Sequence, residues 1–389
     1  MGGTGMRPAS KLLTALCLAL GSSAALANDP GVTDTEIVVG GFVPFTGPAG
    51  LLGYAGTLGS RIAAAEINDR GGVNGRKINL IVEDDEYVPA KSVQAMQKLI
   101  DVHDIFAMTS VSGGSHGLAV MPMIEEHNIP TINPLVTTDA HFEPARASFF
   151  GIGMSYQQGV IDLVRFVDAT EDGLTWGSIV QDDESGIPRE EGLDTVLAEL
   201  GKEAVLKQRF KRGQADFAAE VLRAREAGVD AIVLGGLPAQ NAAILKEAKK
   251  IGYAPKFGAV WMDHIPQVID LYGPEGDGVY VYDFVPSMTD ERLKPFLELA
   301  NKYLPAEDVP KLNRYSIIAY TGMKVHAAAM EACGKELTRA CEIENLKKIR
   351  DFDAGFMAPL SFGEDVRLTD LKGSVLRVDH AAGAFVAVE

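Results

Sequence analysis

The stretch that decides the fold class begins Ile37-Val38-Val39-Gly40-Gly41-Phe42-Val43. This run is short, almost wholly apolar and punctuated by glycines, which is typical of a strand buried on both faces of a parallel sheet. Apolar residues then recur at helical spacing from Leu58 to Ala65, and Gly71-Gly72 end that helix. Residues 78–83 read as the next strand, so the stretch predicts a strand–helix–strand unit.

Strand and helix patterns alternate along the rest of the chain in the same way. Further strands are predicted over residues 105–109, 129–132, 176–181, 204–210, 230–235, 256–261 and 279–284. Helices are predicted over 89–102, 118–126, 190–200, 217–226, 240–251, 293–303 and 315–333. Such repeats indicate an α/β protein with parallel sheets covered by helices on both faces. A break over 149–155 and the length of 389 residues favour two similar lobes.

The first residues have the pattern of a secretory signal peptide. Arg7 and Lys11 form a basic start, and residues 12–20 form an apolar run without charge. Small residues ending Ala25-Leu26-Ala27 predict cleavage after Ala27, and therefore export to the periplasm. The apolar run is about half of the roughly 20 residues that span a bilayer.

Two alternatives to cleavage are weaker. A signal anchor would need a longer apolar run. A lipid anchor on Cys17 would need a small residue before it, where Leu16 stands. No later segment is long and apolar enough to insert into a membrane, so the mature chain is expected to be soluble.

The charge of the mature chain excludes some classes of partner. Without Arg7 and Lys11 there remain 34 basic and 53 acidic residues, a net charge of −19. Such a surface repels nucleic acid and anionic lipid, and it favours a soluble monomer. The sign of a ligand is not fixed by this average, because a cleft can differ from the surface.

The cysteines predict a disulfide. Cys17 leaves with the signal peptide, so Cys333 and Cys341 remain as a pair in an oxidising compartment. Two buried thiols are the alternative. No metal site is predicted, because no third thiol lies nearby and the seven histidines lack ligand spacing.

The candidate binding residues follow the predicted strands, because ligands of open α/β sheets bind beyond the strands' carboxyl ends. The strongest loop is 110–117, in which Gly113-Gly114 allow close backbone approach and Ser115 stands at a helix start. That combination suits a carboxylate. Alternatively, Ser115 caps its helix, and Thr137 and Thr138 cap theirs.

The same loop matches a hydrolase motif, G-x-S-x-G, over residues 113–117. Asp379-His380 or Asp263-His264 could complete a triad with Ser115. However, a nucleophile elbow turns directly off its strand, whereas residues 110–112 intervene here. No dinucleotide fingerprint or P-loop is present, no cofactor is expected, and the acidic run 83–86 reads as a solvated strand end.

Several longer motifs resemble the periplasmic Leu/Ile/Val-binding protein family, the type I substrate-binding receptors of ABC importers. The resemblance extends over nearly the whole mature sequence. Its most specific pieces are Thr46-Gly47-Pro48, the run 64–76 (AAEINDRGGVNGR), Asp84-Asp85 followed by Pro89, and the run 129–134 (IPTINP).

The resemblance implies two Rossmann-like lobes joined by a three-crossover hinge that closes on ligand. We expect the crossovers near 151–155, 284–286 and 359–363. The expected division is a signal peptide over 1–27, a first lobe over 28–153 plus 286–360, and a second lobe over 154–285 plus 361–389.

The resemblance also implies first-lobe roles. Ser115 and the backbone of Gly114 would hold a ligand carboxylate, with Thr137 and the backbone of Leu135 assisting. Leu52 would contact the apolar part of the ligand, and Tyr54 would lie close by.

The second lobe departs from the family pattern. Trp261 stands where an amino-acid receptor places a carboxylate for the ligand ammonium, and Asp263 could substitute if the loop is shifted. Ser185 lies in the run that replaces the usual tyrosine, and Leu237 replaces another aromatic residue. These positions and Ser155 complete the ligand-contact candidates. A buried ammonium without a counter-charge costs several kcal/mol, so Trp261 suggests an aromatic or aliphatic acid, unless it only packs between the lobes.

The sequence therefore predicts a receptor without enzymatic activity that captures a small carboxylate-bearing solute, an amino acid or an aromatic or aliphatic acid, for an ABC permease. A sensor that reports the ligand to a signalling partner is the alternative, since the fold supports both. A secreted hydrolase using Ser115 ranks third.

Overall fold

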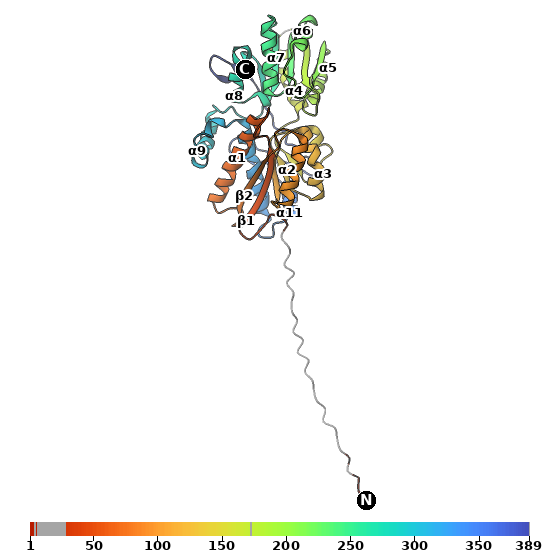
Figure 1. The fold of residues 1–389 in the computed structure, drawn as a ribbon, viewed down its shortest axis with the longest axis vertical. Coiled ribbons are helices and arrows are strands. Elements are labelled where there is room, and N and C mark those ends of the chain that lie inside the picture. The colour runs from red at the N-terminus through yellow and green to blue at the C-terminus, as the bar shows by residue number, and fades with distance from the viewer. Residues whose placement is uncertain (4, 6–28, 172, 389) are drawn as a thin grey trace.

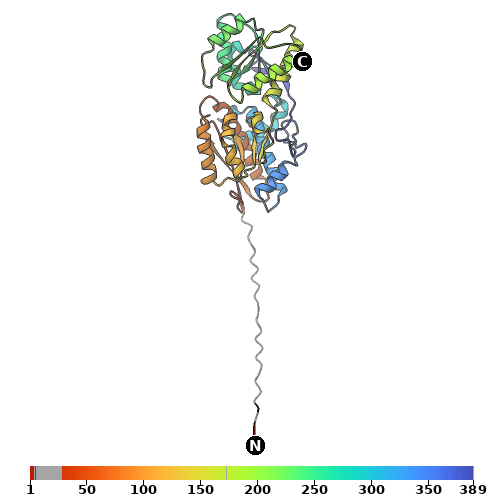
Figure 2. The ribbon, with the colours of Figure 1, turned by 90° about the vertical axis from the view of Figure 1, so that its right-hand side faces the viewer.

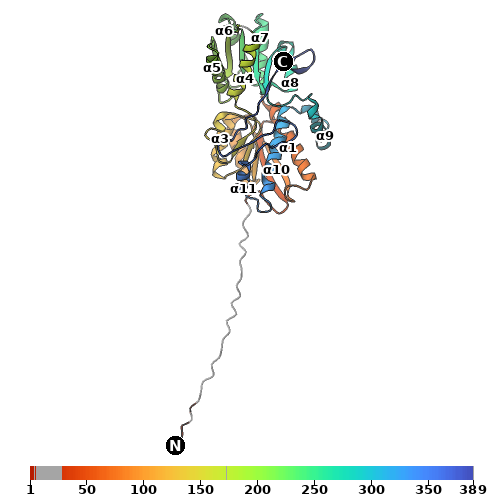
Figure 3. The same cartoon turned by 180° about the vertical axis from the view of Figure 1, so that it is seen from behind.

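The structure is a computed structural model that describes residues 1–3, 5, 29–171 and 173–388. The predicted signal peptide and its cleavage after Ala27 lie outside the described residues. Two lobes lie one above the other in Figure 1, and the view at 90° in Figure 2 shows the same division. Seen from behind in Figure 3, α10 and α11 belong to the lower lobe, and the C-terminal end to the upper.

The first lobe contains a five-stranded parallel sheet in the order β2-β1-β3-β4-β5. The interior strand β1 pairs with β2 over its full length and with β3 on its other side. The strands are β1 (Glu36–Val43), β2 (Lys77–Asp84), β3 (Ala107–Val111), β4 (Thr131–Asn133) and β5 (Phe149–Gly151). The opening run of the sequence is thus a buried strand inside a parallel sheet, as predicted.

Helices cover both faces of this sheet because successive side chains of a strand point to opposite faces. Ala107 packs in the core beneath α1 and α10, whereas its neighbour Met108 packs in the core beneath α2 and α3. The helices of this lobe are α1 (Gly50–Asp69), α2 (Pro89–Asp101), α3 (Gly114–Glu126), α9 (Lys294–Tyr303), α10 (Arg314–Ala332) and α11 (Arg339–Leu346).

The predicted disulfide is confirmed. Cys333 follows the last residue of α10, and Cys341 lies in α11, with their Cα atoms 6.0 Å apart. The bond ties the two helices of the first lobe together, and it rules out the alternative of two free thiols.

The second lobe contains a seven-stranded sheet in the order β12-β11-β10-β9-β8-β6-β7. Its strands are β6 (Trp176–Gln181), β7 (Leu206–Phe210), β8 (Ala231–Gly235), β9 (Lys256–Val260), β10 (Tyr280–Asp283), β11 (Ser374–Asp379) and β12 (Ala384–Ala387). Residues of β8 alternate between the two cores on either face of the sheet. Helices α4 (Tyr156–Thr170) and α5 (Ile187–Glu199) cover one face, and α6 (Ala218–Glu226), α7 (Pro238–Lys250) and α8 (Pro266–Tyr272) cover the other.

This second sheet is mixed, whereas the repeated units predicted parallel strands only. β11 runs antiparallel to β10, with Asp283 opposite Ser374, and β12 forms a hairpin with β11. The reason is connectivity: the chain leaves β10 for the first lobe and returns at the same end of the sheet, so the returning strand must run in the opposite direction.

Because β5 of the first sheet ends at Gly151 and β10 of the second sheet ends at Asp283, we propose that the chain crosses between the lobes at residues 151–155 and 284–286. We place the third crossing later than the expected 359–363. Phe362 packs on Phe150 of the first lobe, with ring centroids 5.2 Å apart. Leu368 pairs with Gly151 as a parallel bridge, and β11 begins only at Ser374. The expectation missed this because one bridged residue gives no strand pattern. We propose that the first lobe extends to residue 368.

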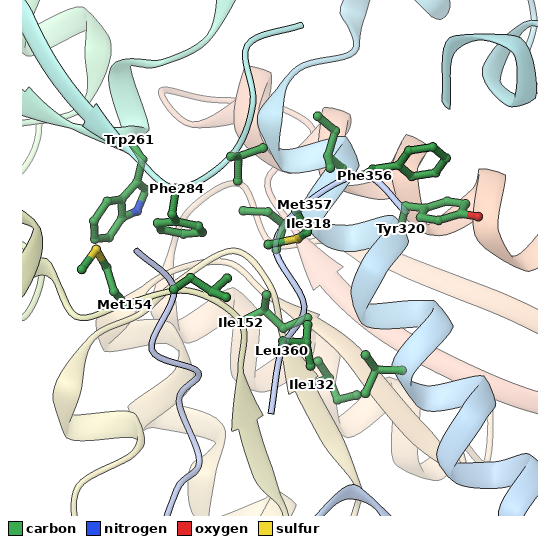
Figure 4. Close-up of a cluster of buried hydrophobic side chains, with 14 of the residues drawn as sticks. Ile132, Ile152, Met154, Trp261, Phe284, Ile318, Tyr320, Phe356, Met357 and Leu360 are labelled. Atoms are coloured by element: carbon green, nitrogen blue, oxygen red, sulfur yellow. The ribbon is translucent and has the colours of Figure 1, made fainter. Parts of the chain in front are cut away.

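The hinge is packed rather than loose. One hydrophobic cluster continues from the first-lobe sheet through the crossovers into the second lobe, as Figure 4 shows from Ile132 through Ile152 and Phe284 to Trp261. Burial of that apolar surface stabilises the crossing segments, and it fixes where the two lobes meet.

Candidate ligand-binding site

A cavity lies between the lobes at the carboxyl ends of the strands, and residues of both lobes line it. It encloses about 30 Å³ of free space, which is close to the volume of one water molecule in the liquid. A larger solute therefore needs a wider cleft. The lining residues are Pro44, Ala49, Leu52, Gly53, Tyr87, Ser112, Gly113, Gly114, Leu135, Val136, Tyr156, Ser185, Leu237, Met262 and Tyr315.

The first-lobe wall is built around the N-terminus of α3, which begins at Gly114, four residues earlier than predicted. Gly113 and Gly114 both line the cavity, where free N–H groups of the first helical turn favour a negative group. A Cβ atom on Gly114 would lie 3.0 Å from Thr138 Oγ1 and 3.2 Å from Glu184 Cβ. The glycine thus allows the lobes to approach closely.

Ser115 contacts the other lobe instead of lining the cavity. Its Oγ accepts a hydrogen bond from Arg212 Nη2 at 2.7 Å, and Arg212 also donates to Asp183. The guanidinium lies 5.0 Å from the ring centroid of Tyr87. Thr138 Oγ1 makes a second contact between the lobes by donating to the carbonyl of Glu184. The lobes therefore touch across the cleft.

The side chains of Ser115, Thr137 and Thr138 do not cap helices, which was the alternative role that the sequence left open for them. Gly113 is the N-cap residue of α3, and no side chain caps that helix. Thr137 is buried, and its Oγ1 has no hydrogen-bond partner among the described residues.

Leu52 and Leu135 line the cavity, but Tyr54 does not. The Tyr54 hydroxyl donates to Asp308 Oδ1 at 2.9 Å. That hydrogen bond, assisted by burial, raises the pKa of Tyr54. The Tyr54 hydroxyl thus binds Asp308 and does not face the cavity.

The second-lobe wall consists mainly of apolar side chains. Tyr156, Leu237 and Met262 line the cavity together with the hydroxyl-bearing Ser185. Ser155 does not line it: its Oγ accepts from Gln158 N at 3.1 Å and caps α4.

Trp261 lies behind this wall. Its ring stacks on Tyr156 with centroids 5.2 Å apart and planes 15° apart, and it meets Phe284 edge-on at 5.1 Å. Figure 4 shows it beside Phe284 and Met154 at the end of the hinge cluster. Trp261 therefore occupies the packing position that the sequence left as its alternative role, and Tyr156 faces the cavity in its place.

Asp263 is also turned away from the cavity. Its carboxylate accepts from Asn241 Nδ2 at 2.9 Å and from the Tyr272 hydroxyl at 2.6 Å. Burial raises the pKa of Asp263 to about 6, although both hydrogen bonds oppose the rise. No aspartate or glutamate is among the described residues that line the cavity.

Arg189, the third residue of α5, was missed by the sequence analysis. Its side chain is 1% exposed, and Nη2 donates to Ser185 Oγ at 3.3 Å. The guanidinium lies 4.6 Å from the ring centroid of Tyr156 and contacts Met262 Sδ. Because cations in the first turn of a helix oppose its dipole, an arginine at this position was a usable signal.

The hydrolase alternative finds no support in the geometry. His264 Nδ1 lies 2.6 Å from Asp283 Oδ2, and Asp263 binds Asn241 and Tyr272. Neither reaches Ser115, whose side-chain partner is Arg212.

Nothing in the described part of the chain groups three or more His, Cys, Asp or Glu residues as a metal site would require. The acidic run at the end of β2 is occupied locally. Asp84 accepts from Phe45 N and Thr46 Oγ1, while Glu86 pairs with Lys91. Within the described residues, no helix has the length and apolarity to cross a membrane.

Comparisons with known proteins agree with the geometry. Residues 36–383 match the family model of the periplasmic binding proteins. Leu/Ile/Val-binding protein homolog 7 of Brucella abortus (strain 2308) is 24% identical over 345 residues, which cover 86% of this chain and 82% of that protein.

Two solved structures are similar over more than nine tenths of their length. The fatty acid ABC transporter substrate-binding protein from Thermomonospora curvata has a TM-score of 0.82 at 24% identity and covers 93% of both chains. A solute-binding protein of an ABC transporter from R. palustris, in complex with 4-hydroxybenzoate, has a TM-score of 0.81 at 19% identity, covering 91% of this chain and 96% of that one. The chain belongs to the periplasmic binding protein family, in its Leu/Ile/Val-binding type.

Proposed function

We propose that the protein is the periplasmic substrate-binding receptor of an ABC importer and captures a small carboxylate-bearing solute in the cleft between its lobes. The observation that carries the proposal is the cavity itself, which both lobes line at the carboxyl ends of their strands. Hinge closure would bury the solute, and the permease would recognise the closed form.

The chemistry of the walls suits such a ligand. The N–H groups at the start of α3 and the hydroxyls of Ser112 and Ser185 offer donors, while Leu52 and Leu237 offer apolar surface. Similar proteins include Leu/Ile/Val-binding homologues, a fatty acid receptor and a 4-hydroxybenzoate complex. Binding of this kind needs no chemical step, so the proposal includes no enzymatic activity.

A thermal-shift screen of the refolded protein tests the proposal. Refolding removes solute carried through purification, and the panel contains amino acids, aromatic acids, aliphatic acids, neutral amides and sugars. A true ligand at a hundredfold excess over its Kd stabilises the protein by about 2.7 kcal/mol. A shift with neutral amides or sugars, and with no carboxylate, would overturn the proposal.

A further inference from the structure

We propose that Arg189 is the residue that binds the acid group of the solute, so that the cleft selects organic acids over the corresponding α-amino acids. This inference rests on the proposed function and specifies its substrate class. It would make Arg189, which sequence reasoning did not single out, the specificity-determining residue of the second lobe.

The first observation is a buried cation without a counter-charge. Arg189 is 1% exposed, and its Nε has no hydrogen-bond partner among the described residues. Across the same part of the chain, no carboxylate lies within 4.0 Å of its guanidinium. A buried charge of this kind is costly unless something pairs with it.

The neighbouring acids are already engaged. Asp183 pairs with Arg212 and also accepts the backbone N–H groups of Ser185 and Gly186. Asp263 is held by Asn241 and Tyr272. The positive charge of Arg189 is therefore left for a group that enters from the cavity.

The second observation is that Arg189 reaches the cavity wall. Its Nη2 donates to Ser185 Oγ at 3.3 Å and contacts Met262 Sδ at 3.4 Å, and its guanidinium stacks over Tyr156. All three partners line the cavity. A guanidinium is planar and carries paired donors, which matches the two oxygens of a carboxylate.

The third observation is that neither wall offers an acid to an ammonium group. The opposite wall presents the N-terminus of α3, where positive charge is disfavoured. Asp85 lies behind Ser112 of that wall, but it is fully buried and accepts hydrogen bonds from the hydroxyls of Ser112 and Ser92. A protonated amine would thus enter a cleft without an acid in its lining.

Calorimetry on the purified full chain with matched ligand pairs tests this inference. Each pair differs only in the ammonium group: 4-methylpentanoate against leucine, and 3-phenylpropanoate against phenylalanine. We expect the acid of at least one pair to bind at least tenfold more tightly than its amino acid.

Variants of Arg189 provide the second readout. Arg189→Gln should weaken binding of the acid at least a hundredfold, and Arg189→Lys should restore part of it. Arg165→Gln is the matched control, because Arg165 pairs with the exposed Glu199 at the far end of α5. It should leave affinity unchanged within twofold. If Arg189→Gln does not fold, the affinity of Arg189→Lys for the acid and the affinities of the wild type for the matched pairs still test the role of Arg189.

The outcomes separate the two proposals. Tighter binding of the amino acid in every pair that binds would overturn the role of Arg189. It would leave the receptor function intact. Unchanged affinity of the acid in Arg189→Gln would do the same. Absence of binding by both members of both pairs, and by every carboxylate of the wider panel, would overturn both proposals.

Discussion

The two walls of the cleft come from similar strand–helix units but present different chemistry to a solute. The first-lobe wall combines the glycines and backbone N–H groups where α3 begins with apolar and aromatic side chains such as Leu52 and Tyr315. The second-lobe wall is made of side chains, with Arg189 behind Ser185, Tyr156 and Met262. The backbone N–H groups at the start of α3 can accept many carboxylates, whereas the charge of Arg189 is found only behind the second-lobe wall and distinguishes the two walls.

The largest expected effect concerns the buried ion pair between Asp283 and Arg314, which joins the two lobes at the hinge. Asp283 of β10 accepts from Arg314 Nε at 2.6 Å and Nη2 at 2.9 Å, and all of these atoms are buried. Burial alone would raise the pKa of Asp283, but Arg314 and His264 hold it below its usual value. Asp283→Asn leaves Arg314 without its counter-charge, so we expect a loss of about 3–5 kcal/mol in unfolding free energy.

Urea denaturation measures that loss. Asp290→Asn is the control, because Asp290 pairs with the exposed Arg292 and should contribute less than about 1 kcal/mol. A loss at Asp283 as small as that of the control would mean that the two lobes do not depend on this pair.

A second prediction concerns acid response on the second-lobe side. Burial raises the pKa of Asp263 from 3.8 to about 6. The folded state therefore binds the proton more tightly than the unfolded state. The resulting contribution of Asp263 to the unfolding free energy is fully present below pH 3.8 and is lost as the pH rises through 6. The loss amounts to about 3 kcal/mol. Asp263→Asn should remove this fall in stability between pH 4 and pH 7, as followed by thermal melts.

His141 in the first lobe should make stability depend on pH in the opposite direction to Asp263. Burial lowers its pKa from 6.5 to about 4, and its Nε2 donates to the carbonyl of Gly114 at 2.8 Å. The neutral ring is favoured in the fold, so its contribution is present above pH 6.5 and is lost, by about 3 kcal/mol, as the pH falls to 4. Removal of that acid-induced loss in His141→Gln is the expected result; an unchanged pH profile would contradict it.

The disulfide gives a smaller effect, confined to the first lobe and distant from either wall. It closes a short loop between residues eight apart in sequence, for which loop-closure entropy predicts about 2.5 kcal/mol. The double variant Cys333→Ala, Cys341→Ala should lower the melting temperature and leave solute affinity unchanged. A change in affinity would show that α10 and α11 influence the cleft.

The smallest expected effect compares one hydroxyl from each lobe, that of Ser185 and that of Ser115. Ser185 lines the cavity and binds Arg189, so Ser185→Ala should weaken solute binding by about 1 kcal/mol, roughly fivefold. Ser115 contacts only the partly exposed Arg212, so Ser115→Ala should cost about 0.5 kcal/mol, roughly twofold. Calorimetry measures both losses of affinity. A larger loss in Ser115→Ala than in Ser185→Ala would indicate that Ser115, and not the wall beside Arg189, binds the carboxylate.

The sequence alone determined the fold class and most elements, because buried strands and amphipathic helices are local patterns. It also located Gly113-Gly114, because they directly follow a predicted strand, and the pair Cys333 and Cys341, because no other cysteine follows the predicted signal peptide. The antiparallel return of β11 and the third crossing near Leu368 depended on where distant segments meet, which no local pattern records.

Only the tertiary structure decided which side chains of the second lobe face the cleft. Trp261 and Asp263 are only two residues apart and both are buried in packing, yet Met262 between them lines the cavity. Arg189 lies more than seventy residues earlier and reaches Met262 through the fold. Side-chain direction follows from the packing of one helix against another, and that packing is a property of the whole chain.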